Sequence, residues 1–278
     1  AVPAGADGAF KASYTRCFQY IQQAIVSTSG SPVDVWLPAS PTIRPQISDQ
    51  FSIGYDRLFM GNALRASVEL FYKDNSNTLD FVENTGVIFD RPDRESFLRF
   101  GRSDTYGAEF MLSYDFRKLN GWIGYTYSHA TYRIPEINGG RPYASPVNHD
   151  HSINLLLSYE LGRRVSASMY WVFYSGAPTT YPVSRYPLGG SYAPIFTSRN
   201  EKRLPDYHRM DLSLSCKTRG RLENKRWSGE GTFSVYNAYS RHNVWSMVYS
   251  YSQHDDKPRA VKMYLFPILP SFAYNIIF

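Results

Sequence analysis

Apolar and polar side chains alternate along most of this chain. Between residues 105 and 116 every even-numbered residue is apolar or aromatic, and every odd-numbered residue except Met111 is small or polar. Successive residues of a β-strand point to opposite faces, so this alternation indicates a strand with one apolar face. The pattern recurs and predicts an all-β chain of about ten strands, at residues 8–20, 49–58, 62–73, 105–116, 123–130, 152–161, 165–174, 209–217, 229–251 and 260–278.

The final strand of this series alternates up to the last residue. Phe272, Tyr274, Ile276 and Phe278 share one face, and the other face carries mostly small or polar residues. Such an ending suits a strand that closes a barrel in lipid. It is similar to the terminal signal of bacterial outer-membrane proteins, and this resemblance implies that the four residues form a barrel-assembly signal. An edge strand of a soluble sandwich would alternate in the same way.

The lengths of the connections distinguish a membrane barrel from a soluble sandwich. Outer-membrane barrels have short periplasmic turns and long extracellular loops. Short links are predicted after Phe59 and at 117–120, 162–164 and 218–227, and they alternate with long links at 22–48, 78–103, 133–147 and 177–204. No apolar run approaches the ~20 residues of a membrane-spanning helix. The chain is therefore predicted to be a transmembrane antiparallel β-barrel, whose aromatic girdles would account for its 16% aromatic residues.

Charged side chains fall on the polar face of the predicted strands. Placing Arg or Lys against lipid at the membrane midplane costs roughly 2–4 kcal/mol, so this face should meet water or a polar filling. Arg16 has the opposite parity and is expected at the level of the outer headgroups. The net charge of +6 is scattered without a basic stripe, so nucleic-acid binding is not predicted. The predicted lumen-facing or plug-facing residues are Arg65, Glu69, Lys73, Glu109, Asp115, Asn154, Glu160, Arg209 and Asp211.

Few residues suggest chemistry. In the segment His149-Asp150-His151 the two histidines are expected on one face, with Asp150 opposite, but no third metal ligand accompanies them. A polar strand start is the favoured interpretation, and neither a cofactor nor an enzymatic activity is predicted. Cys17 is expected to point inward and Cys216 outward, which makes a disulfide between them improbable.

Several segments resemble, in order, the barrel of TonB-dependent receptors, in particular those of Bacteroidetes. The similar segments are 33–59, 68–74, 106–116, 121–133, 149–161, 174–182, 203–215 and 233–245. Members of this family have an N-terminal plug, a segment that contacts TonB and ~22 strands. The resemblance covers most of the chain. It implies that residues 1–278 are the C-terminal part of such a barrel, with the plug and the first strands absent from this sequence.

The resemblance also implies a function and a set of partners. The function would be energy-coupled uptake of a bulky nutrient, such as a siderophore, cobalamin, a glycan or a peptide, across the bacterial outer membrane. The partners would be the remaining barrel half and plug, the TonB–ExbB–ExbD complex through that plug, lipid or lipopolysaccharide, and a surface lipoprotein lid. The alternative is a self-closed ten-stranded barrel that acts as a protease or an adhesin. Only in this small barrel would the strands at 8–20 and 260–278 pair with each other.

Overall fold

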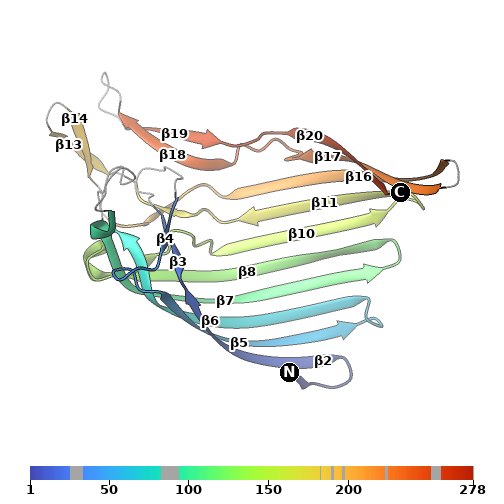
Figure 1. The fold of residues 1–278 in the computed structure, drawn as a ribbon, viewed down its shortest axis with the longest axis horizontal. Helices are drawn as coiled ribbons and strands as arrows, with labels where there is room; N and C mark the ends of the chain where they lie inside the picture. Colours follow the sequence, from blue (N-terminus) through green and yellow to red (C-terminus); the bar gives the residue numbers. More distant parts are fainter. Residues whose placement is uncertain are drawn as a thin grey trace.

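Ten long strands form one antiparallel sheet in the computed structural model of this chain (Figure 1), which describes residues 1–25, 34–82, 94–181, 183–188, 191–195, 198–222, 225–251 and 258–277. The all-β prediction is confirmed. In spatial order the strands are β2 (Gly8–Gln19), β5 (Gln46–Phe59), β6 (Leu64–Phe81), β7 (Leu98–Phe116), β8 (Leu119–Arg133), β10 (His151–Glu160), β11 (Val165–Tyr174), β16 (Tyr207–Leu222), β17 (Lys225–Tyr236) and β20 (Leu269–Ile277). Two-residue strands, β1 (Val2–Pro3) and β9 (Tyr143–Ala144), extend the sheet locally. None of the helices among the described residues has the length and apolarity to span a membrane.

The short turns that the structure describes lie at one end of the sheet (Figure 1), which we call the turn end. One of them covers residues 60–63, and another consists only of Arg117 and Lys118. Tight hairpin turns require left-handed backbone, which glycine and asparagine adopt at least cost. Gly61 and Asn62 have φ values of 61° and 74° in the first turn. These turns join strands that are neighbours in both sequence and space.

The opposite end, which we call the loop end, carries the long connections and several small strand pairs (Figure 1). These pairs add nothing to the main sheet, because each strand bonds only to its partner. The loop end also contains two 3-10 turns, one before β7 at Arg94–Phe97 and another at Asn138–Gly140. The pairs are β3 (Ile21–Ile25) with β4 (Asp34–Pro38), β12 (Pro178–Thr179) with β15 (Lys202–Arg203), β13 (Ser184–Leu188) with β14 (Ser191–Ile195), and β18 (Val244–Tyr251) with β19 (Pro258–Tyr264).

The predicted bounds of two strands near the C-terminus are wrong. The segments 229–251 and 260–278 were each predicted as one strand, but β17 ends at Tyr236, and β18 and β19 form a separate hairpin before β20 begins. Asn237 causes the break, since it has a φ of 53° and its side-chain amide donates to the Arg241 carbonyl oxygen over 2.9 Å. Alternation resumes after this turn, so periodicity alone does not detect it.

The link predicted at 78–103 is also shorter than expected. Strand β6 continues to Phe81 and β7 begins at Leu98, so both strands rise further toward the loop end. A bulge between Ser76 and Thr78, centred on Asn77 with a φ of 60°, shifts the alternation of β6 by one residue. A bulge of this kind hides the rest of a strand from a search for period two.

The register gives the sheet one apolar and one polar face. A single row of directly opposed residues crosses six strands on the apolar face and consists of Phe10, Tyr55, Val68, Phe110, Tyr125 and Ile153. Many large apolar side chains on this face are exposed, among them Phe51, Ile53, Leu70, Leu112, Leu214 and Phe272. An apolar surface of this extent is suited to lipid and not to water.

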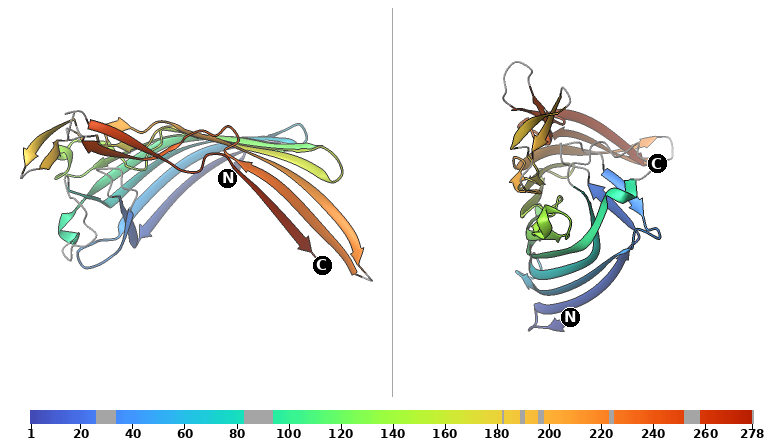
Figure 2. Two further views of the ribbon diagram at one scale, coloured as in Figure 1. Left: turned by 90° about the horizontal axis from the view of Figure 1, so that it is seen from above. Right: turned by 90° about the vertical axis from the view of Figure 1, so that its left-hand side faces the viewer.

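The polar face is the concave one. A hollow of about 370 Å³ lies on it and is lined by residues of strands from β2 to β8, including Thr15, Gln50, Lys73, Thr105 and Ser128. Figure 2 shows the curvature of the sheet, with β2 and β20 at the two ends of the arc. Buried apolar packing lies instead at the loop end, where the β3–β4 hairpin covers the ends of β6 and β7 through Ala24, Leu37, Leu79, Phe81 and Leu98.

The described sheet is open. Strand β20 pairs only with β17, and β2 pairs with β5 and, over two residues, with β1. The first and last long strands therefore do not pair with each other. A self-closed ten-stranded barrel, which was the alternative interpretation, requires that pairing. The described sheet does not have it.

Candidate functional site

A pocket of about 570 Å³ lies on the polar face at the loop end of the sheet. Its wall is formed by β11, β16 and β17, and the base of the β18–β19 hairpin supplies the opposite side. Aromatic rings dominate the lining and leave few formal charges. The main lining residues are Tyr170, Tyr174, Tyr207, Arg209, Tyr236, Trp245 and Phe266.

Arg209 organises the wall of this pocket. Its Nε donates to Asp211 Oδ2 over 3.0 Å, and its Nη1 donates to Tyr207 Oη over 3.0 Å and to Tyr236 Oη over 2.8 Å. The guanidinium carbon also lies 4.2 Å from the centre of the Tyr236 ring. Several charge-assisted contacts to one planar group fix its orientation. Arg209 and Asp211 therefore neutralise each other's charge. The hydrogen bonds from Arg209 also hold Tyr207 and Tyr236 in fixed orientations on the pocket wall.

The far side of the pocket comes from residues distant in sequence. Asn243 exchanges two hydrogen bonds with the backbone of His208, at 3.1 Å to its N–H and 2.9 Å to its carbonyl oxygen. The backbone N–H of Asn237 donates to Asp211 Oδ1 over 2.9 Å. These contacts hold the chain after β17 against β16, which brings Trp245 over the polar face.

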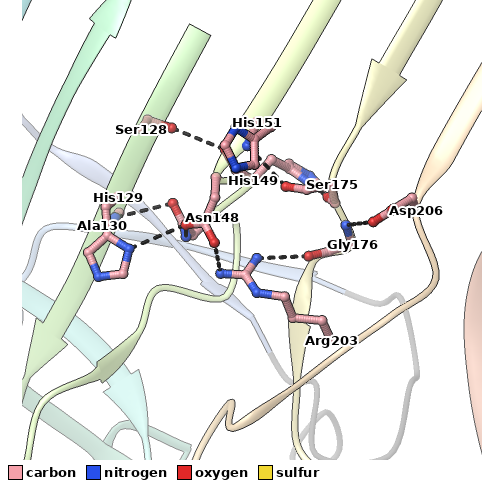
Figure 3. A network of polar contacts seen from close by, with 11 residues as sticks. Ser128, His129, Ala130, Asn148, His149, His151, Ser175, Gly176, Arg203 and Asp206 are labelled. Carbon is pink, nitrogen blue, oxygen red and sulfur yellow. Dashed lines mark hydrogen bonds and ion pairs between the residues drawn. The ribbon is translucent and has the colours of Figure 1, made fainter.

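A polar network beside the pocket ties the loops to the sheet (Figure 3). Asp150 accepts a hydrogen bond of 2.7 Å from Asn148, lies 3.3 Å from Nδ1 of His129 and forms an ion pair with Arg203. Arg203 also donates to the Gly176 carbonyl oxygen over 2.9 Å, so the network reaches both ends of the connection between β11 and β16.

The network lowers the pKa of Asp150. Burial by itself raises the pKa of this carboxyl, but hydrogen bonds from Asn148 and His129 and the positive charge of Arg203 outweigh burial. Because the pKa is lower in the folded chain than in the unfolded chain, the network stabilises the fold above the usual titration range of an aspartate. That contribution is lost as the pH falls through the lowered pKa.

The two histidines of the 149–151 segment do not share a face, contrary to the prediction. His149 lines the pocket, with its ring centre 5.5 Å from that of Tyr174 and its Nδ1 2.6 Å from the Ser175 carbonyl oxygen. The Nδ1 of His151 is 2.9 Å from Tyr125 Oη on the apolar face. Strand β10 begins at His151, so strand alternation does not extend back to His149. No group of three His, Cys, Asp or Glu residues among those described could hold a metal ion.

The register places all nine residues predicted to face the lumen on the polar face, but it does not bring them together. Arg209 and Asp211 form the wall of the pocket, and Asn154 accepts a hydrogen bond of 2.9 Å from Tyr170 Oη below it. Lys73 lines the separate hollow between β2 and β8.

The other members of this set lie further toward the turn end. Glu69 and Glu109 are directly opposite each other, and Arg65 lies 2.9 Å from Asp56 in an ion pair. Opposed like charges are unfavourable across a strand pair. The two remaining members lie close to the turns: Asp115 and Glu160. The nine residues thus line the full height of the polar face instead of forming a single site.

The terminal strand and the two cysteines lie on the faces that alternation predicts. Phe272, Tyr274 and Ile276 are exposed on the apolar face, whereas Phe278 lies outside the described residues. Cys17 lines the hollow on the polar face, and Cys216 is opposite Val165 on the apolar face. Both cysteines are free thiols.

Sequence reasoning missed a buried ionic cluster at the loop end. Arg199 Nη2 donates to Asp80 Oδ1 over 2.8 Å, and Tyr143 Oη donates to Asp80 Oδ2 over 2.8 Å. The Arg199 and Asp80 side chains are only 3% and 2% exposed. Burial, together with the charge of Asp80, raises the pKa of Tyr143 well above its usual range. Asp80 and Arg199 are 119 residues apart in links predicted as irregular, so no local signal indicated the pair.

The fold is that of an outer-membrane β-barrel wall, with a lipid-facing side and a concave polar side. The family profile described as TonB dependent receptor-like, beta-barrel matches residues 5–238. The chain belongs to this family. It is therefore a protein of the bacterial outer membrane, and its family consists of receptors and not of enzymes.

Solved structures of the same fold are distant in sequence. The ferripyoverdine receptor of Pseudomonas aeruginosa is 14% identical, with a TM-score of 0.57 over 96% of this chain and 31% of the receptor. The ferric-catecholate import receptor Fiu of E. coli K12 is 15% identical, with a TM-score of 0.55 over 98% of this chain and 33% of the receptor. The siderophore receptor PirA of Acinetobacter baumannii is 10% identical, with a TM-score of 0.53 over 86% and 36%. The chain thus spans about a third of the proteins that it resembles. No curated protein sequence matches it.

Proposed function

We propose that residues 1–278 are the C-terminal part of the barrel of a TonB-dependent transporter, of the Bacteroidetes type, that takes up a bulky nutrient across the outer membrane. The open sheet carries this proposal. Its outermost strands present unpaired backbone groups, and a sheet with open edges is not stable in lipid. Further strands of the same transporter would complete the wall of ~22 strands, and its plug would fill the lumen.

The proposed partners follow from this arrangement. The rest of the barrel would pair with β2 and β20, and the plug would lie against the concave face and couple it to the TonB–ExbB–ExbD complex. A surface lipoprotein lid would cover the loop end. The opposed Glu69 and Glu109 carboxylates have no cationic partner among the described residues. A basic side chain of the plug would therefore neutralise their negative charge and relieve their repulsion.

The proposed roles of single residues divide between the two faces. The nine residues of the polar face would contact the plug or the water of the lumen. Phe272, Tyr274 and Ile276 would form, with Phe278, the signal that the assembly machinery reads. Their exposure on the apolar face supports this role.

The class of nutrient is proposed from the pocket and from the structural neighbours. Those neighbours are receptors for ferric siderophores. The pocket offers several tyrosine rings and hydroxyls at the end where an extracellular nutrient would enter. A siderophore is therefore the first candidate, with cobalamin, a glycan or a peptide as the others. A strain without the complete protein should lose growth on one nutrient of such a panel, and collapse of the proton gradient should abolish the uptake that the intact gene restores. Wild-type uptake of every nutrient by the deletion strain would refute the proposal.

A cross-linking experiment tests whether the barrel is larger than this chain. Cys17 lies near the loop end of β2, and Ser271 lies near the loop end of β20 on the same face. In the intact protein carrying Ser271→Cys and Cys216→Ser, we expect no short cross-link between Cys17 and the new thiol. The matched control combines Ser271→Cys with Ser234→Cys, because Ser234 and Ser271 are directly opposite and should cross-link. Efficient linkage to Cys17 would favour the small barrel.

A substitution in the pocket tests its role in uptake. Arg209→Gln removes the group that orients Tyr207 and Tyr236, and losing a charge-assisted hydrogen bond costs about 1.5–3 kcal/mol. We therefore expect nutrient binding to weaken at least roughly tenfold while barrel assembly is retained. The control is Arg65→Gln, which lies on the same face near the turn end and should leave binding unchanged. Equal nutrient affinities of the two variants in a binding titration would exclude the pocket as the nutrient-binding site.

A further inference from the structure

The pocket on the polar face is close to electrically neutral. Among the described residues that line it, Arg209 is the only one with a permanent charge. The carboxylate that balances this charge, Asp211, lies outside the lining, directly opposite Tyr170 and further toward the turn end than Arg209. The Arg209 and Asp211 side chains are only 20% and 24% exposed, so water screens their attraction weakly. A ligand in the pocket therefore meets a guanidinium whose charge is already compensated.

Two further arginines close to the pocket have acidic neighbours. Arg203 donates to the carbonyl oxygen of Gly176, which lines the pocket, and forms an ion pair with Asp150. Arg241 Nη2 donates to the backbone carbonyl oxygen of Asp206 over 3.2 Å, which holds it beside an acidic residue. Asp206 in turn accepts a hydrogen bond of 2.9 Å from the backbone N–H of Gly176. These arginines are matched by aspartates, so they leave little net positive charge to attract an anion.

Several polar side chains of the lining already have partners within the chain. Tyr170 Oη donates to Asn154 over 2.9 Å, and Asn243 uses its amide on the backbone of His208. His149 Nδ1 donates to a backbone carbonyl oxygen over 2.6 Å. Groups that are paired in this way have little capacity left for a ligand. The surface that the pocket offers is therefore chiefly the faces of its aromatic rings.

These rings form a series along the wall of the pocket. The ring centre of Tyr174 lies 5.5 Å from that of His149 and 5.9 Å from that of Tyr207. Trp245, which also lines the pocket, is 45% exposed. The face of an aromatic ring carries partial negative charge, so it attracts C–H groups and the edges of other rings and repels a carboxylate. The pocket therefore suits an uncharged ring, whereas an anion would find no free cation in it.

We propose that the pocket accepts an uncharged ring of the imported nutrient, and that Asp211 determines this preference by compensating the charge of Arg209. Asp211 does not touch the ligand and acts through Arg209. The inference rests on the proposed function, because it takes the pocket as the nutrient-binding site. It narrows that function to nutrients that present a neutral sugar or aromatic ring at the loop end, and it excludes those that present a carboxylate there.

The test uses the intact protein purified in detergent and two matched probes, para-nitrophenyl glucoside and para-nitrophenyl glucuronide. Both probes have the same two rings, and a hydroxymethyl group of the first is a carboxylate in the second. In a titration followed by saturation-transfer NMR, we expect the wild type to bind the glucoside about tenfold more tightly, because the carboxylate would lack a partner. For Asp211→Asn we expect glucuronide affinity to rise about tenfold, since the charge of Arg209 is then uncompensated, while glucoside affinity stays close to the wild-type value.

Two control variants separate the charge of Asp211 from a structural role. Asp211→Glu keeps the carboxylate and should keep the wild-type preference for the glucoside. Asp115→Asn makes the same substitution on the same face near the turn end, and it should also leave the preference unchanged. All three variants should show the heat-modifiable folded band, because Arg209 keeps its hydrogen bonds to Tyr207 and Tyr236.

The ratio of the two affinities decides the outcome. Equal wild-type affinities for the two probes, binding of neither probe, or an unchanged preference in Asp211→Asn would overturn the inference. A change in Asp115→Asn as large as that in Asp211→Asn would overturn it as well. Failure of the proposed function has a different signature, namely wild-type uptake of every nutrient by the deletion strain, so the two failures can be distinguished.

Discussion

Leu155→Arg is expected to prevent most of the protein from assembling in the outer membrane, whereas Asn154→Arg, one residue away, should be tolerated. Leu155 lies in the middle of β10 on the apolar face, opposite Ile123 and Trp171. An arginine there would face hydrocarbon at a cost of roughly 2–4 kcal/mol. Asn154 points to the concave polar face, where it accepts a hydrogen bond from Tyr170, and a charge there can reach water.

Heat modifiability of the intact protein in gels measures this difference. The folded, faster-migrating band should be strongly depleted for Leu155→Arg and close to the wild-type level for Asn154→Arg. The two substitutions introduce the same side chain at adjacent positions of one strand. The two variants therefore differ mainly in the face of the sheet that receives the arginine. Equal folded fractions for the two variants would contradict the assignment of the two faces.

The second large effect is expected at the loop end. Asp80→Asn removes the counter-charge of Arg199, which stays buried with two of its nitrogens, Nε and Nη1, already lacking hydrogen-bond partners. Breaking a buried ion pair from one side costs about 3–5 kcal/mol. The loops held by this pair should therefore open locally while the strands remain paired. Hydrogen exchange at the backbone amide of Asn200, which donates to Thr180 Oγ1 over 2.9 Å, should accelerate at least roughly a hundredfold.

Two further variants separate loss of the pair from a general disturbance of the loops. Lys202→Gln breaks an exposed pair with Glu201, at 3.6 Å, and an exposed pair contributes only about 0–1 kcal/mol, so exchange should change little. The double variant Asp80→Asn/Arg199→Met removes the unpaired charge and should recover much of the protection. Acceleration in Lys202→Gln as large as in Asp80→Asn would show that the buried pair has no special role.

Much of the wall could be predicted from the sequence because strand faces depend only on residues two positions apart. The faces of Leu155, Arg209 and Cys17 follow from that alternation, and the structure agrees with each. The failures occur where the backbone leaves the regular strand. Asn77 inserts a bulge that shifts the alternation of β6 by one residue, and Asn237 turns the chain before alternation resumes in β18.

By itself, the sequence determined that the chain forms a two-faced antiparallel wall, since alternation is a local property of the backbone. Only the tertiary structure decided that β2 and β20 do not meet, that Trp245 reaches the pocket of Arg209, and that Asp80 and Arg199 are buried together. These relations depend on hydrogen-bond register and on how loops fold over the sheet. Contacts of this kind join residues tens to more than a hundred positions apart, for which strand periodicity carries no information.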